Sequence, residues 1–145
     1  MIRRFLELFT APQGELNQAP DVGLAAAILM VEVMKADHQI DDSERASLLA
    51  SIRTLTGRND TDAEALLQEA LSASQSANDL FRFTEAVHAN WTEQQKSDLL
   101  VALWRVAFAD NQLDRYEEHI IRRIADLLYV PHSEFIRTKL IARDQ

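Results

Sequence analysis

One short pattern occurs twice in the chain, and equivalent positions are offset by 73 residues. Its two copies read ADHQIDDSE at residues 36–44 and ADNQLDRYE at residues 109–117, and five of the nine positions are identical. An apolar stretch precedes each copy, and a stretch with apolar residues at helical spacing follows it. This self-similarity predicts a duplicated unit of three helices, and we expect the two halves to be related by a pseudo-two-fold axis.

Helical periodicity extends over most of the chain, and no strand of more than about four residues fits the pattern. Glycine and proline number only three each in 145 residues, which disfavours a turn-rich all-β fold. Thr92 and Gln95 match a capping box, and Trp91, Trp104 and the phenylalanines are expected in the core. The sequence therefore predicts an all-α fold with helices over residues 21–36, 42–55, 61–71, 78–90, 92–109, 115–129 and 133–142, with a polar connection over residues 72–78.

The predicted domain, residues 21–145, contains repeat one at about 21–72 and repeat two at about 78–142. Residues 1–20 form an N-terminal arm, in which residues 2–9 make a short amphipathic helix and the remainder a linker. The arm packs on the body or, alternatively, docks on a partner or a membrane surface. Its apolar stretch is too short for a secretory signal, and no apolar run reaches the roughly 20 residues that span a bilayer. We therefore expect a cytoplasmic protein without a transmembrane segment.

An excess of acidic residues limits the partners. The chain has 23 Asp and Glu against 15 Lys and Arg, a net charge of -8, which disfavours nucleic acid because phosphates need clustered cations. A basic protein partner suits this charge better. No cysteine is present, which excludes thiol catalysis and thiolate metal sites and leaves oxygen and imidazole ligands.

The doubled pattern, an apolar helix followed by Ala-Asp-x-x-Ile/Leu-Asp-x-x-Glu and an amphipathic helix, resembles the tellurite-resistance TerB-like family over roughly residues 22–141. The resemblance implies an all-helical single domain built by duplication, a link to tellurite or other stress resistance, and metal binding. It implies no enzymatic activity. The family commonly has glycine after the first Asp, where this chain has His38 and Asn111. Asn and, less readily, His tolerate the left-handed conformation that a tight turn needs.

Six carboxylates belong to the two copies, and four of them have a structural explanation. The second Asp of each copy is placed as an N-cap, and the Glu three residues later completes a capping box. The first Asp falls at a helix C-terminus, where the helix dipole disfavours negative charge, so we expect it to bond turn N–H groups or to hold a ligand. The six residues are Asp37, Asp41, Glu44, Asp110, Asp114 and Glu117.

A divalent cation is the alternative use of these carboxylates, because hard oxygen ligands suit Ca²⁺, Mg²⁺ or Mn²⁺. The spacing is not that of an EF-hand. With Asp37 as position 1, position 6 is Asp42 rather than glycine and position 12 is Leu48 rather than glutamate.

Two further charges lie inside the apolar stretches at equivalent positions of the repeat. Glu32 and Arg105 are predicted to form a central ion pair, a device that sets helix register more readily than it adds stability. The alternative makes Glu32 a further metal ligand.

Three functions follow from these features. The first is a non-enzymatic interaction module that acts through a protein partner and is modulated by a divalent cation at its acidic turns. The second is a metal-dependent enzyme that uses the clustered carboxylates. The third is a membrane-peripheral adaptor that uses residues 2–9. The oligomeric state is left open, including a homodimer through the arm or through exposed helix faces.

Overall fold

The computed structural model describes residues 22–34, 40–74, 80–109 and 115–144. Every regular element in these ranges is a helix, as the sequence predicts. None of these helices is both long enough and apolar enough to cross a bilayer. They are α2 (Val22–Met34), α3 (Asp42–Thr56), α4 (Asp60–Ser74), α5 (Leu80–Asn90), α6 (Glu93–Ala107), α7 (Arg115–Leu127) and α8 (His132–Arg143).

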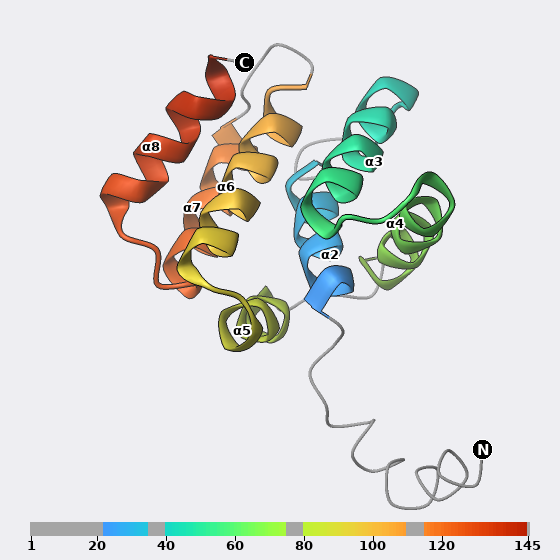
Figure 1. Ribbon diagram of the computed structural model, residues 1–145. Helices are drawn as coiled ribbons and strands as arrows, with labels where there is room; N and C mark the ends of the chain where they lie inside the picture. The colour runs from blue at the N-terminus through green and yellow to red at the C-terminus, as the bar shows by residue number, and fades with distance from the viewer. Residues whose placement is uncertain (1–21, 35–39, 75–79, 110–114, 145) are drawn as a thin grey trace, which may run out of the picture.

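Two helices, α2 and α6, lie at the centre of the molecule and pack against each other (Figure 1). On one side α4 packs on α2, and on the other side α8 packs on α6. α3, from the first half, also packs on α6, and α7, from the second half, also packs on α2. α5 precedes α6 in the chain but packs on α2 and α7. The helix order is that of a duplicated unit with one additional helix, while the pseudo-two-fold axis stays a prediction.

The core is centred on α2 and on the inner face of α6. Ten of the 13 residues of α2 are buried, because five other helices pack on it. Burial of this apolar surface is the main favourable term for the fold. Trp104 of α6 is fully buried and meets Phe135 of α8 edge-on, with 5.1 Å between ring centroids. The outer helix α8 is thereby anchored to the centre.

Local signals place several helix ends where the sequence predicts them. Thr92 and Gln95 form the expected capping box of α6, each side chain bonding to the backbone N–H of the other residue. Gly57 ends α3 in the left-handed conformation at φ 71°, and its N–H donates to the Arg53 carbonyl at 2.9 Å. Pro131 precedes α8, a position where its missing N–H costs nothing.

Three boundaries differ from the prediction by two residues or more. α6 ends at Ala107 rather than near residue 109, where the N–H of Ala109 bonds to the Val106 carbonyl, three residues back, at 3.2 Å. α4 continues to Ser74 rather than ending near residue 71, because Ser74 is buried and donates a hydrogen bond to Glu32 of α2. In the first half, the third helix is therefore as long as the second. α7 ends at Leu127, two residues earlier than predicted, because Tyr129 adopts a left-handed conformation at φ 62°.

One predicted core residue is exposed. Phe81 of α5 is 50% exposed, whereas Phe83, two positions on, is buried. Successive positions of a helix are about 100° apart, so residues two apart lie on opposite faces. The helix predicted at residues 2–9 and both predicted ends of the helix over residues 21–36 lie outside the described residues.

Candidate functional site

The first acidic junction joins α2 to α3, and its second part is described. The Asp41 carboxylate accepts a hydrogen bond from the Glu44 backbone N–H at 2.8 Å, and the Glu44 carboxylate accepts one from the Asp41 backbone N–H at 2.9 Å. This reciprocal pair is the predicted capping box. Glu44 is only 2% exposed. Its position in the first turn of α3 places its negative charge beside the positive end of the helix dipole, which stabilises that charge.

The second junction shares the buried glutamate. Glu117, in the first turn of α7, is the equivalent of Glu44 and is likewise 2% exposed. Its predicted capping partner Asp114 lies outside the described residues, as do Asp37 and Asp110. A repeated capping box would produce the matching burial of the two glutamates, and the capping role of Asp114 stays a prediction.

The described residues give a partial view of the predicted metal ligands. Within the described ranges, no group of three His, Asp or Glu side chains is placed to hold a metal ion. Asp41 and Glu44 each use one carboxylate oxygen for a backbone N–H group. Because three of the six carboxylates lie outside these ranges, cation binding at the junctions stays a prediction.

The central charges Glu32 and Arg105 are both half-buried. The Glu32 carboxylate accepts a hydrogen bond from the hydroxyl of Ser74, 42 residues away on α4. Arg105 lines a groove between α3, α6 and α8. Their ion pair stays a prediction, while the contact between Glu32 and Ser74 has no signal in the sequence because it depends on the packing of α4 on α2.

A groove of about 400 Å³ lies between α3, α6 and α8, a size typical of binding clefts. Its lining is mixed, with apolar side chains beside hydroxyls, carboxamide and charged groups. Nothing in the sequence indicates this groove, because its residues come from three helices that only tertiary packing brings together. The lining residues are Ser51, Thr54 and Leu55 of α3, Gln94, Ser97, Asp98, Val101, Ala102 and Arg105 of α6, and Arg137 and Ile141 of α8.

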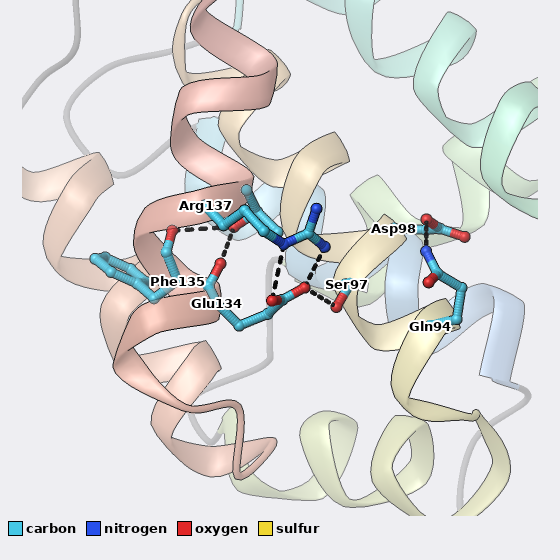
Figure 2. A network of polar contacts seen from close by, with 7 residues as sticks. Gln94, Ser97, Asp98, Glu134, Phe135 and Arg137 are labelled. Atoms are coloured by element: carbon cyan, nitrogen blue, oxygen red, sulfur yellow. Dashed lines mark hydrogen bonds and ion pairs between the residues drawn. The ribbon is translucent and has the colours of Figure 1, made fainter.

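A polar network beside this groove joins α6 to α8 (Figure 2). Ser97 Oγ donates to the Glu134 carboxylate at 2.6 Å, and Arg137 Nε donates to the same carboxylate at 2.9 Å. The Arg137 guanidinium, followed by the Ser97 hydroxyl, lowers the pKa of Glu134 from 4.5 to about 2, because both donors favour the charged carboxylate. One helical turn along α6, Gln94 donates to Asp98 at 2.9 Å. The network fixes one wall of the groove.

The outer face of α4 is a negatively charged surface. This helix has four acidic residues and no Lys or Arg. Two of the four pair with arginines of α3: Arg53 Nη1 lies 2.8 Å from the Asp60 carboxylate, and Arg45 contacts both carboxylate oxygens of Glu64. The hydrogen bond from Arg45 lowers the pKa of Glu64.

The other two acidic residues of α4 face solvent. Asp62 and Glu69 are exposed and line a shallow depression together with Arg58. The repeated pattern drew attention to six carboxylates at the two junctions, none of which belongs to α4, although the absence of Lys and Arg from residues 60–74 is visible in the sequence.

Comparison with known proteins gives a family match. A family model described as "Tellurite resistance protein TerB" matches residues 23–140, from the first turn of α2 into α8. No curated protein and no solved structure matches the chain.

Proposed function

Because the chain belongs to the TerB tellurite-resistance family, we propose that it is a non-enzymatic helical module of tellurite and stress resistance that binds a basic protein partner at the outer face of α4. One observation carries this proposal, namely the unequal charge of the two halves. Residues 22–74 contain nine acidic and four basic residues, whereas residues 80–145 contain ten and nine. A field concentrated on one side of a protein attracts and orients an oppositely charged partner.

The arrangement of α4 supports a binding role for part of this charge. Arg53 and Arg45 of α3 compensate Asp60 and Glu64. The exposed Asp62 and Glu69, seven residues apart, stand two turns from each other along one side of the helix. Their spacing suits two basic side chains of a partner, which would gain most at low ionic strength.

Charge reversal on α4 tests this proposal. Asp62→Lys combined with Glu69→Lys should abolish tellurite tolerance in a strain that carries only this copy of the gene. A matched control, Glu85→Lys with Asp126→Lys, makes the same change in net charge on exposed positions of α5 and α7. Circular dichroism establishes that both variants fold. Equal tolerance of the two variants would contradict the proposal.

Quantitative capture experiments extend this test to the partner itself. Proteins retained by the wild type and by the control, lost with the α4 variant and released by raised salt would be basic partners of this face. If the retained proteins are the same for all three forms at every salt concentration, the α4 face is not the binding surface.

Modulation by a divalent cation belongs to the same proposal, with the carboxylates of the two junctions as ligands. Calorimetry with Ca²⁺, Mg²⁺ and Mn²⁺ on the wild type and on Asp37→Asn tests it. Absence of heat and of a shift in melting temperature would remove both this modulation and the alternative of a metal-dependent enzyme.

The cytoplasmic location and the membrane alternative remain predictions of the sequence. A membrane-peripheral adaptor would need residues 2–9, so deletion of these residues should reduce co-sedimentation with liposomes. Unchanged co-sedimentation would rule out this alternative.

A further inference from the structure

α5 packs mainly on the central helix of the first half of the molecule. It leads into α6, from which only two residues separate it, but it packs on α2 and α7. Its buried side chains include Phe83 and Thr84, and Leu80 packs against the same core. α5 is therefore one of the helices that complete the burial of α2.

The described helices leave the corresponding side of α6 open. On α2, Ala25 and Ile28 are fully buried. Their equivalents 73 residues later are Asp98, which is exposed, and Val101, which is half-buried. Both line the groove between α3, α6 and α8. Among the described helices, only α2, α3, α7 and α8 make extensive contact with α6, so no counterpart of α5 covers this groove.

The N-terminal arm has the sequence of such a counterpart. Residues 6–10 read LELFT, and residues 80–84, the start of α5, read LFRFT. The offset is 74 residues, within one residue of the offset of the main repeat. The three shared residues are those that α5 directs to the core, Leu80, Phe83 and Thr84. The arm also stands in the same place in the order of the repeat, ahead of α2 as α5 stands ahead of α6.

We infer that residues 2–10 of the same chain dock in the groove between α3, α6 and α8, with Leu6 and Phe9 against its apolar side chains. The groove offers Leu55, Val101 and Ile141 for this contact. Two prolines and a glycine in residues 11–21 disfavour a helix there, and a chain of eleven residues extends to at most about 36–40 Å. The whole of α6 is about 22 Å long, so the linker reaches any part of the groove. This inference does not depend on the α4 surface.

A single cysteine tests whether the groove is covered, because the chain has no cysteine of its own. Val101→Cys places a thiol on the groove wall, and its rate of labelling by a thiol reagent reports access. Leu6→Ser should raise this rate about tenfold or more, because the arm loses one buried leucine. Leu8→Ser is the matched control, because its α5 equivalent, Arg82, is exposed. Thr54→Cys on α3 gives a second probe of the same groove.

Equal labelling rates in the Leu6→Ser and Leu8→Ser backgrounds, at both probe positions, would overturn the inference. The occupant is then identified by disulfide formation in the full-length chain. Leu6→Cys paired with Val101→Cys should give a monomeric disulfide faster than Leu6→Cys paired with Ala65→Cys on the exposed side of α4. Disulfide-linked dimers would show that the arm occupies the groove of a second copy, and equal rates for the two pairs would show that it does not dock. Either result overturns docking within one chain.

Discussion

The two halves of the domain begin from one sequence pattern and end with different surroundings. α2 has ten of its 13 residues buried, and α6 has nine of 15. Ile28 on α2 is 1% exposed, whereas its equivalent Val101 on α6 is half-buried beside a groove. α5 packs on α2 and makes no comparable contact with α6. Equivalent positions therefore differ in burial because different neighbours cover them.

Charge differs between the halves in the same way. α4 has four acidic residues and no Lys or Arg, whereas its counterpart α8 has one acidic residue and three basic ones. Both helices nevertheless pack on a central helix. Packing constrains the residues on the inner face of each outer helix, whereas the charges on its outer face are free to differ. The two halves therefore share an arrangement of helices and differ in the charge of their outer surfaces.

Deletion of side-chain volume at equivalent positions should separate the two halves most strongly. Ile28→Ala should lower the free energy of unfolding by about 2–4 kcal/mol, because it leaves a cavity in the core. Val101→Ala should cost less, about 1 kcal/mol, because the described helices leave this side chain half-buried and the docked arm packs only on its groove side. Urea denaturation followed by circular dichroism measures both. Equal losses would mean that the two central helices are equally covered.

Truncation of the buried glutamates should instead show the halves to be alike. Glu44→Ala removes the acceptor of the Asp41 N–H and should cost about 1–2 kcal/mol. Glu117→Ala should cost the same if the second junction repeats the capping box. Glu85→Ala, on an exposed position of α5, is the control and should change stability by less than about 0.5 kcal/mol. A much smaller loss for Glu117→Ala would show that the junctions are built differently.

The turns that follow α3 and α7 each contain a residue with positive φ, which is glycine after α3 and tyrosine after α7. Gly57→Ala should destabilise by about 1 kcal/mol through backbone strain alone, since an added Cβ would meet no atom within 4 Å. Tyr129 has a similar left-handed conformation without being glycine, so Tyr129→Gly should be neutral or stabilise by up to about 1 kcal/mol. Thermal melting measures both changes. Stabilisation by Gly57→Ala would contradict this account.

The smallest effect should come from the network of Glu134, Ser97 and Arg137, which belongs to the second half. The pKa of Glu134 is lowered from 4.5 to about 2, so the stability that its charge contributes is fully present above pH 4.5 and is lost as pH falls towards about 2. Glu134→Gln should cost up to about 1 kcal/mol at pH 7, discounted for partial exposure. The difference in unfolding free energy between wild type and variant should shrink across that pH window. A difference independent of pH would assign the effect to packing.

Much of the fold could be predicted from local sequence. The helix order, both described capping boxes and the glycine stop after α3 depend on residues at most four apart, where backbone geometry dictates which groups meet. The boundaries that differ have tertiary or backbone causes. α4 is extended where Ser74 bonds Glu32 across 42 residues, and α7 is shortened where Tyr129 turns left-handed.

The candidate site was less accessible to sequence reasoning. The acidic junctions stood out because their carboxylates recur at one offset, and the structure describes the box of Asp41 and Glu44 in the first. No sequence pattern indicates the groove, since Ser51, Val101 and Ile141 belong to no motif within their own helices. Only the packing of α3 and α8 on α6 brings them together.

By itself, the sequence determined the class of fold, the order of its helices and the family, because these depend on periodicity and on spacing along the chain. The tertiary structure alone decided that α5 packs on the central helix of the other half, that the described helices leave one side of α6 open, and that the groove there is mixed in character. These features depend on contacts between residues tens of positions apart, where no local rule specifies which helix faces meet.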